Sequence, residues 1–448
     1  MSLNQAWINR DLAVLWHPCT QMKDHESLPP IPIARGEGAW LIDFDGRRYL
    51  DAIGSWWVNL FGHANPTINA RIKAQLDTLE HVILAGFSHA PVVELAERLK
   101  AITPALLTRV FFTDNGSSGI EAALKMSFHY WRNTGLPNKT RFIAIEGSYH
   151  GETLGALGVG NIAIFSETYA PLIKPALIAP SPDCRQALPD EPCAMVTERA
   201  LLGLRALLLH HSDEVAALII EPLVQCAAGM RMHEPAYLAG VRALCDEFNI
   251  HLIADEIAVG FGRTGTLFAC EQADITPDIL CLSKGITGGY LPLCAVLTTE
   301  TLYQAFYCEA PASRAFLHSH SYTGNPLACV AALATLDLFE QNQVIKHNQA
   351  RSAMIETLLT PLRQHPNLAH VRRRGMMIAM DLCAKNGHPF PRSERRGQRA
   401  YRHALDAGVL LRPLGDTLYW MPPYILSDAE WQMLATTTLN AVNAATRA

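Results

Sequence analysis

The feature that most constrains the fold is a series of short apolar runs that alternate with longer segments of helical character. The runs cover residues 110–113, 142–145, 216–220, 251–254 and 279–282. Continuous apolar runs of this length are typical of strands that are buried on both faces, as in a parallel sheet with helices on either side. The pattern therefore predicts an α/β fold built on a parallel sheet.

One helix between these runs can be assigned from its periodicity. Its apolar and small residues recur at helical spacing. They are Ile120, Ala123, Leu124, Ser127, Phe128 and Trp131. We expect this face and the neighbouring Tyr130 to be buried in the core.

The two ends of the chain have a different character. Residues 40–50 alternate in polarity and turn at Asp45-Gly46, which is typical of a β-hairpin. Beyond residue 340 a second α/β pattern begins, with apolar segments near 376–382 and 419–421. Two further segments are expected to be loops, the proline-rich 171–192 and the exposed, arginine-rich 389–399.

Charge, hydropathy and cysteine content exclude several classes. Lys and Arg total 37 against 42 Asp and Glu, so the basic excess of nucleic-acid-binding proteins is missing. No apolar stretch reaches the roughly 18 residues of a membrane span, and the first residues show neither a secretory nor a transit pattern. The 11 cysteines include no C-x-x-C pair, so we expect reduced, mostly buried thiols, no metal site and a cytoplasmic location.

A turn at residues 116–119 has the composition of a phosphate-binding site. Gly116-Ser117-Ser118-Gly119 closes a predicted strand and opens the helix described above. The free N–H groups and the dipole of a helix N-terminus attract a phosphate. A simple helix cap has the same composition, so the turn needs other groups nearby before it indicates a ligand.

Two strand ends supply those groups. The run before Asp255 ends in an acidic pair, and the run before Lys284 ends in a lysine. Ligands of open α/β sheets bind at the carboxyl ends of the strands, so both side chains are expected at one crevice. A lysine that forms an imine, an acid beside a pyridinium nitrogen and a phosphate turn describe a pyridoxal 5′-phosphate site, with Tyr149 stacked on the ring.

A nicotinamide dehydrogenase is the alternative. Residues 260–265 match G-x-G-x-x-G, and Asp278 follows at the spacing that dinucleotide binding requires. Four residues separate Asp255 from Gly260, where a tight turn is needed, and the residues after 265 favour an extended run over a helix.

From Trp16 to Pro423 the chain resembles the class III, fold type I aminotransferases. The likeness is carried by the cofactor signature at residues 252–258, 260–265 and 281–285. It implies a homodimer with shared active sites, and a large domain whose mainly parallel sheet is flanked by helices. The implied parts are a cofactor-binding domain at 54–340 and a smaller α/β domain from 1–53 and 341–448.

Within that class, the chain resembles the enzymes that move the amino group of S-adenosyl-L-methionine to 8-amino-7-oxononanoate. This gives 7,8-diaminononanoate for biotin biosynthesis. The likeness rests on segments 16–18, 55–57, 149–151, 229–232 and 411–413. The alternative is another class III transaminase, with an ω-amino acid, a diamine or lysine as donor.

The resemblance assigns roles to residues of the cofactor site. Lys284 matches the lysine that forms the imine, and Asp255 matches the partner of the pyridine nitrogen. Tyr149 matches the tyrosine that stacks on the ring and faces the substrate. Gly116 and Ser117 match the phosphate turn.

It also assigns substrate contacts. Trp56 matches an aromatic wall, Arg412 the arginine that receives the oxononanoate carboxylate, and Arg263 a second arginine near that pocket. The chain departs from the family where Cys19 replaces a tyrosine, Glu152 an aspartate, Ser319 a glycine and Ser321 a threonine. Cys19 and Ser319 remain expected substrate contacts, and Ser321 is expected to reach the phosphate of the neighbouring subunit.

Overall fold

The computed structural model describes residues 1–188, 190–311 and 313–447, and the contacts within the chain divide it into two units. Unit 1 contains Met1–Asn69, Arg351–Val371 and Ile378–Ala448. Unit 2 contains Ala70–Ala350 and Arg372–Met377. The domain limits expected at residues 53 and 340 stay predictions.

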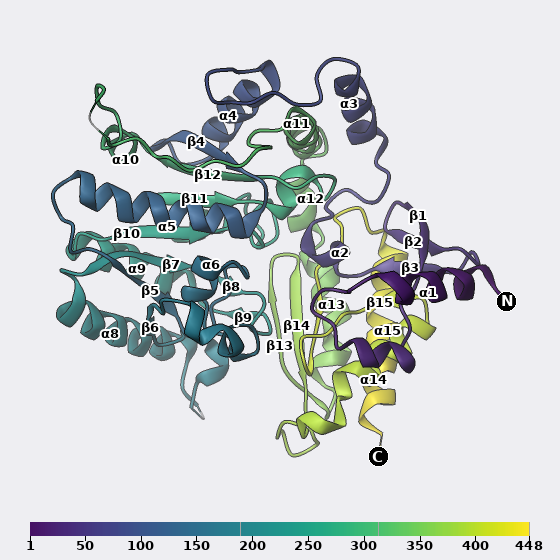
Figure 1. Ribbon diagram of the computed structural model, residues 1–448. Helices are drawn as coiled ribbons and strands as arrows, with labels where there is room; N and C mark the ends of the chain where they lie inside the picture. The colour runs from purple at the N-terminus through teal and green to yellow at the C-terminus, as the bar shows by residue number, and fades with distance from the viewer. Residues whose placement is uncertain (189, 312, 448) are drawn as a thin grey trace. The chain divides into compact units, whose positions relative to one another are not determined.

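A seven-stranded sheet forms the centre of unit 2 (Figure 1). In spatial order its strands are β4 (Leu107–Thr113), β12 (Cys294–Thr299), β11 (Ile279–Leu282), β10 (His251–Asp255), β7 (Val215–Ile220), β5 (Arg141–Ile145) and β6 (Leu177–Ala179). Neighbouring strands are parallel except at β12, which is antiparallel to both β11 and β4. The five predicted strands are confirmed, and the sheet is mainly parallel.

Helices surround this sheet. They are α3 (Pro66–Leu76), α4 (Ala90–Ile102), α5 (Gly116–Asn133), α6 (Leu154–Gly158), α7 (Ala163–Ser166), α8 (Cys193–His211), α9 (Pro235–Glu247), α10 (Glu300–Gln304), α11 (Pro326–Gln341) and α12 (Val344–Ala350). Two short strands outside the sheet, β8 (Val224–Gln225) and β9 (Arg231–Met232), pair with each other. Short 3₁₀ turns connect several of these elements. The alternation of strands and helices makes unit 2 an α/β structure, as predicted.

The predicted helix is α5, which lies along the sheet in Figure 1. Its buried residues include Ile120, Ala123, Leu124, Ser127 and Trp131, as the periodicity requires. The prediction was wrong for Phe128 and Tyr130, which are only half-buried. Both lie at the edge of the apolar face, where the Arg132 guanidinium covers the Phe128 ring at 5.6 Å from its centroid.

Unit 1 contains most of two smaller sheets, and only residues 372–374 of β13 and 377 of β14 belong to unit 2. The first, in order, consists of β1 (Ile33–Glu37), β2 (Trp40–Asp43), β3 (Arg48–Asp51) and β15 (Val409–Leu410), and the second of β13 (Leu368–Arg374), β14 (Met377–Leu382) and β16 (Thr417–Trp420). Its helices are α1 (Leu3–Val14), α2 (Gly54–Trp57), α13 (Ser352–Arg363), α14 (Arg396–Asp406) and α15 (Asp428–Thr446). Because β15 pairs with β3, both ends of the chain share one sheet.

The predicted hairpin at residues 40–50 is confirmed. β2 and β3 pair antiparallel, with Ile42 opposite Arg48. Gly46 has a φ of +89° in the turn, which glycine adopts without steric cost. The predicted strands near 376–382 and 419–421 correspond to β14 and β16.

Two predicted loops contain regular structure. Segment 171–192 includes β6, whose Leu177-Ile178-Ala179 pairs in parallel with β5 at the sheet edge. Segment 389–399 includes the first turn of α14, and the guanidinium of Arg396 pairs with Glu394 at 2.6 Å. Neither element could be predicted from local composition, because β6 is stabilised by the neighbouring strand β5 and the start of α14 by an ion pair.

The expectation that all cysteines are reduced was wrong for one pair. Cys184 and Cys193, nine residues apart, form a disulfide that closes the loop before α8. Seven of the free cysteines are buried, and Cys19 and Cys308 are exposed. The prediction of mostly buried thiols is confirmed for the rest of the described chain.

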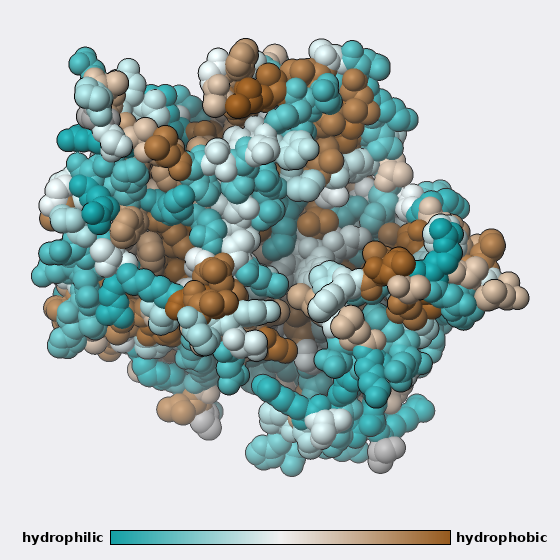
Figure 2. Space-filling view, viewed as in Figure 1, coloured by the Kyte–Doolittle hydropathy of each residue, from teal (hydrophilic) through white to brown (hydrophobic). Residues whose placement is uncertain are grey.

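The core of unit 2 lies between the sheet and α5. It includes Ile120, Ile219, Ile253, Ile279 and Val296, all of them fully buried. Among the helices of the described residues, none is both long and apolar enough to cross a membrane. Figure 2 shows hydrophilic residues over most of the visible face, with apolar patches between them.

Candidate active site

Asp255 and Lys284 lie at the carboxyl ends of neighbouring parallel strands. β10 ends at Asp255, and β11 ends two residues before Lys284. The register places Asp255 opposite Cys281. Lys284 has a φ of +47°, a left-handed conformation that costs a non-glycine residue energy and is found most often at functional sites.

The carboxylate of Asp255 is buried and oriented by two hydrogen bonds. Its Oδ2 lies 2.7 Å from Nδ1 of His150, and its Oδ1 accepts from the Ile257 N–H at 3.1 Å. Asp255 is 4% exposed and His150 is 2% exposed. Both oxygens of this carboxylate are therefore held in place, and a carboxylate in a fixed position can pair with a protonated ring nitrogen.

The amine of Lys284 lies in a site that favours its neutral form. Desolvation lowers the pKa of Lys284, and the nearby Cys226, Asp255 and Glu221 act in the opposite direction. A neutral lysine is the nucleophile that attacks an aldehyde. Glu221 follows β7, the other neighbour of β10, and no sequence motif predicted a role for it.

Tyr149 is fixed from both its ends. Its N–H donates to Oε1 of Glu221 at 3.0 Å, and its hydroxyl donates to Oε1 of Glu152 at 2.9 Å. Its ring lies 5.2 Å from that of Phe165. Glu152, which departs from the family pattern, therefore still orients the phenol.

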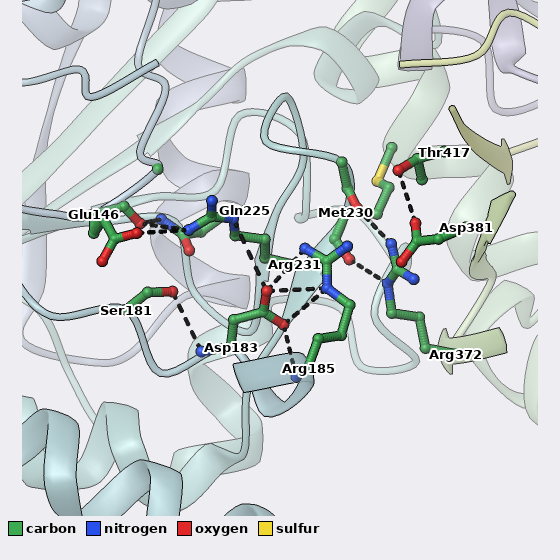
Figure 3. A network of polar contacts seen from close by, with 12 residues as sticks. Glu146, Ser181, Asp183, Arg185, Gln225, Met230, Arg231, Arg372, Asp381 and Thr417 are labelled. Carbon is green, nitrogen blue, oxygen red and sulfur yellow. Dashed lines mark hydrogen bonds and ion pairs between the residues drawn. The ribbon is translucent and has the colours of Figure 1, made fainter. Parts of the chain in front are cut away.

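A polar network holds the backbone that precedes Tyr149 (Figure 3). The carbonyl of Glu146 accepts from Nε2 of Gln225 at 3.1 Å and from Nη1 of Arg231 at 3.3 Å. Arg231 also pairs with Asp183 at 3.9 Å. Gly147 has a φ of +79°, and a Cβ there would lie 2.6 Å from the Arg231 guanidinium, so only glycine fits.

The predicted phosphate turn opens α5. The side chain of Asn115 accepts from the Ser118 N–H and caps the helix, whereas the N–H groups of Gly116 and Ser117, at the first turn, have no acceptor within the helix itself. The Ser117 hydroxyl lies 2.8 Å from that of Thr153. A Cβ on Gly116 would lie 3.0 Å from Ile257, so this turn is packed against the residues that follow Asp255.

These groups fit pyridoxal phosphate. The donor set is a lysine of lowered pKa, a buried carboxylate with two hydrogen bonds and a helix N-terminus next to them. Gly151 has a φ of +121° and lies so close to Ser117 that a side chain would occupy the space before the helix. The cofactor's aldehyde, ring nitrogen and phosphate would each meet a suitable group.

The dinucleotide-binding alternative was wrong. Residues 260–265 form turns that continue into a 3₁₀ segment, Ala269–Ala273, and no α-helix starts at Gly265 in this described part of the chain. The Asp278 carboxylate accepts from Arg242 and from the Leu252 N–H, both at 2.7 Å, and so holds β10 in place. Arg263 is 1% exposed and lies near Cys226, and its expected place beside the substrate pocket stays a prediction.

In unit 1, the structure brings Trp56 and Arg412 together. The Arg412 guanidinium carbon lies 4.1 Å from the centroid of the Trp56 ring, a cation–π arrangement. Trp56 is 39% exposed and has a φ of +69°. Gly54, Ser55 and Trp57 also have positive φ values, so this turn is left-handed throughout.

Asp51 holds this turn, and the sequence did not indicate it. Its Oδ1 accepts from the N–H of Ser55 at 3.0 Å, and its Oδ2 accepts from the Ser55 hydroxyl at 2.7 Å. Nε2 of His63 lies 3.0 Å from the same Oδ2. The only signal in the sequence was an aspartate that directly follows the apolar Tyr49-Leu50 and ends β3.

Cys19, Ser319 and Ser321 are exposed in the chain. Ser319 and Ser321 lie in the segment between α10 and α11, and Cys19 lies after α1. The structure thus groups Gly116, Ser117, Tyr149, Asp255 and Lys284 within unit 2, while these three face solvent. The roles expected of all predicted site residues stay predictions.

Comparisons with known proteins identify the family of the chain. The family model "Aminotransferase class-III" matches residues 21–442. An adenosylmethionine-8-amino-7-oxononanoate aminotransferase of Helicobacter pylori is 46% identical over 425 residues, which is 94% of each chain.

Two solved structures extend the likeness to the fold. The crystal structure of an adenosylmethionine-8-amino-7-oxononanoate aminotransferase from Methanocaldococcus jannaschii has a TM-score of 0.92 at 36% identity, and covers 98% of this chain and 99% of that one. An amine transaminase from an uncultivated Pseudomonas species, in its PLP-bound form, has a TM-score of 0.89 at 34% identity, with 96% and 98% covered. The cofactor of such enzymes is pyridoxal 5′-phosphate, and the chain belongs to the class III, fold type I aminotransferases.

Proposed function

We propose that this protein transfers the amino group of S-adenosyl-L-methionine to 8-amino-7-oxononanoate and so produces 7,8-diaminononanoate. The observation that carries the proposal is the buried, hydrogen-bonded Asp255 beside a lysine of lowered pKa, at the ends of adjacent strands. The full-length similarity to enzymes named for this reaction supports the choice of substrates.

Bound pyridoxal phosphate supplies an electron sink for the pair released when the C–H bond next to the transferred nitrogen breaks. Nζ of Lys284 would hold the cofactor and, once displaced by the incoming amine, carry the proton from that carbon. Asp255 would keep the ring nitrogen protonated, with His150 orienting its carboxylate. The first turn of α5 would bind the phosphate, and Tyr149 would cover the ring.

Arg412 is proposed to bind the carboxylate at the end of the 8-amino-7-oxononanoate chain. A guanidinium offers two parallel hydrogen bonds to a carboxylate. The stacked Trp56 would keep that guanidinium oriented and pack on the apolar part of the substrate. Tyr149, Arg263, Cys19 and Ser319 complete the proposed substrate contacts.

The enzyme is further proposed to act as a homodimer. Ile83, Phe87, Leu317 and Tyr322 are large apolar residues that are more than half exposed. The segments that carry them meet where the Tyr322 ring lies 5.1 Å from His81, and Figure 2 shows an apolar patch at the top of the view, where Figure 1 places α4 and α11. A second copy that covers this surface would receive Ser321 in its phosphate site.

The dimer is tested by sedimentation of the wild type and of Leu317→Asp. We expect a dimer for the wild type and a larger monomer fraction for the variant. A monomeric wild type would contradict the shared site. A cytoplasmic location stays a prediction.

The proposed reaction is tested by the visible spectrum of the purified enzyme, titrated first with S-adenosyl-L-methionine and then with 8-amino-7-oxononanoate. We expect the absorbance band of the lysine-bound cofactor to disappear on the first addition and to return on the second. Loss of the band with the donor alone, without return, would contradict the proposed acceptor.

The second candidate is another class III transaminase, with an ω-amino acid, a diamine or lysine as donor. Two observations favour it: Cys19 stands where a substrate-side tyrosine is usual, and an amine transaminase has nearly the same fold. In the same titration, a band that ignores adenosylmethionine and disappears with lysine or a diamine would support this candidate.

A further inference from the structure

A third ionisable side chain lies in the row of strand ends that carries Asp255 and Lys284. β7 is the neighbour of β10 on the side away from β11, and Glu221 follows its last residue, Ile220. Glu221 is 5% exposed. Three adjacent strands therefore deliver a glutamate, an aspartate and a lysine to one edge of the sheet.

Both carboxylate oxygens of Glu221 accept a backbone hydrogen bond. Oε1 accepts from the N–H of Tyr149 at 3.0 Å, and Oε2 accepts from the N–H of Cys226 at 2.9 Å. The residue after Tyr149 is His150, which contacts Asp255. Glu221 thus anchors the segment that carries the ring-stacking tyrosine and the partner of Asp255.

On the basis of the proposed function, we propose that Glu221 is a positioning residue for the amino-group transfer. It fixes the backbone of Tyr149, and its charge acts on the Lys284 nitrogen in the same direction as that of Asp255, toward the protonated form. An asparagine or glutamine could not replace it, because its amide group would direct N–H at one of two N–H donors.

The surroundings of Glu221 make its charge pH-dependent. Burial raises the pKa of Glu221 to about 7, with Asp255 acting in the same direction and His150 in the opposite one. The groups that face it are His150 on the Tyr149 segment, Asp255 at the end of β10, Cys226 after β8 and Lys284 after β11. Above about pH 7 the carboxylate is charged and favours a protonated Lys284 nitrogen, and below it this effect is lost.

The chain offers a matched control in Glu256. It is fully buried, burial raises its pKa to about 7, and it too accepts two backbone hydrogen bonds, from Ala269 at 2.6 Å and Cys270 at 2.8 Å. The charged group that acts on it is Glu271. Glu256 and Glu221 therefore share burial and bonding but differ in what they face.

The test is a pH titration, from pH 5.5 to 9, of the visible band of the cofactor-loaded wild type, Glu221→Gln and Glu256→Gln. In Glu221→Gln we expect the pH midpoint of the band's titration to fall by about one unit, because the Lys284 nitrogen loses a neighbouring negative charge. The wild-type titration curve should also show an inflection near pH 7, where Glu221 itself titrates, and this inflection should be missing in Glu221→Gln. Glu256→Gln should keep the wild-type curve, whatever stability it loses.

Equal curves for wild type and Glu221→Gln would overturn the inference, as would equal shifts in both variants. If Glu221→Gln does not retain cofactor, Glu221→Asp is titrated instead, because it keeps the charge. We then expect the inflection near pH 7 to persist, and its absence would contradict the role of the charge. If the pH titrations give the expected curves but the band does not respond to adenosylmethionine, the proposed function is contradicted and the role of Glu221 is not.

Discussion

The proposed cofactor site in unit 2 and the Trp56–Arg412 pair in unit 1 differ in burial and in backbone conformation. Asp255 and Glu221 are at most 5% exposed and lie at the ends of a hydrogen-bonded sheet, whereas Trp56 is 39% exposed and stands on a turn of left-handed residues. Buried charges change their proton affinity strongly, and exposed ones do so weakly. In the proposed function, the sheet holds the groups that carry out the chemistry, and a strained turn holds the residues that recognise the substrate.

The strain in that turn has to be compensated locally. Left-handed conformations cost about 1–2 kcal/mol for each non-glycine residue, so Ser55, Trp56 and Trp57 together store several kcal/mol. Asp51 offsets this through three hydrogen bonds to the turn and its contact with His63.

The largest effect is expected on the cofactor side. Lys284→Ala removes the amine that we propose binds the cofactor and carries the proton, so turnover should fall at least about 10³-fold. Urea unfolding should change little, and steady-state turnover with both substrates is the measurement. Wild-type turnover in this variant would refute the mechanism.

The matched control is a second buried lysine, Lys139. Its ammonium donates to the carbonyls of Ser212, Val215 and Asn249. Lys139→Ala should therefore lower the urea midpoint, because three carbonyls lose a donor, and should leave the visible band in place.

The next effect concerns the strained turn. Asp51→Ala leaves the Ser55 N–H, its hydroxyl and His63 without their acceptor, so unit 1 should lose about 3 kcal/mol of stability. The KM for 8-amino-7-oxononanoate should rise with it, because Trp56 is no longer held. Asp45→Ala, at an exposed aspartate of the same unit, is the control for both measurements. An unchanged KM in Asp51→Ala would separate the turn from substrate binding.

Arg412→Ala should act on one substrate only. Loss of a charged hydrogen bond to a carboxylate costs about 1.5–3 kcal/mol, so the KM for 8-amino-7-oxononanoate should rise roughly 10- to 100-fold. The KM for adenosylmethionine should change much less, and both are measured from initial rates. Equal changes for the two substrates would contradict the assignment of Arg412.

The sequence predicted the strands that end at the site but not the directions of all strands. The apolar runs gave β10 and β11, and with them Asp255 and Lys284. β12 is equally apolar, and its antiparallel direction follows from the short turn after Lys284, which returns the chain beside β11. A run of apolar residues has no direction of its own, so only the length of the connection could have indicated it.

Glu221 and Asp51 were missed for a different reason. Each follows or ends a strand as an ordinary acidic residue, and its meaning comes from a partner far along the chain or from an unusual backbone. Glu221 acquires its role because β7 lies beside β10, an order that the sequence alone does not give. Asp51 acquires its role from a left-handed turn at Ser55 and Trp56, where neither residue type favours that conformation.

The smallest predicted effect lies in the pH dependence of stability. Four buried groups of unit 2 contribute to it, two histidines that make stability rise with pH and two glutamates that make it fall. Burial lowers the pKa of His233 and His251 to about 4, and raises the pKa of Glu221 and Glu256 to about 7. Between pH 5 and 6.5 the unfolded chain binds more protons at the histidines, so each makes stability rise with pH by about 1.4 kcal/mol per unit. At the glutamates the folded chain binds more protons, so each makes stability fall by the same amount.

In the wild type the four contributions to the change of stability with pH cancel. His251→Phe removes one of the two contributions that rise with pH, so the two glutamates should dominate. Phenylalanine can keep the stacking on Trp131, whose ring lies 4.6 Å from that of His251, and Ser127 keeps its bond to the Ala216 carbonyl. The stability of this variant relative to the wild type should fall by about 1.4 kcal/mol for each unit of rising pH, measured from urea midpoints at pH 5.0 to 6.5. His388→Gln, at an exposed histidine of unit 1, should follow the wild type. If both variants have the same slope as the wild type, burial does not hold His251 neutral, and the contrast between the buried and the exposed side of the molecule loses its electrostatic basis.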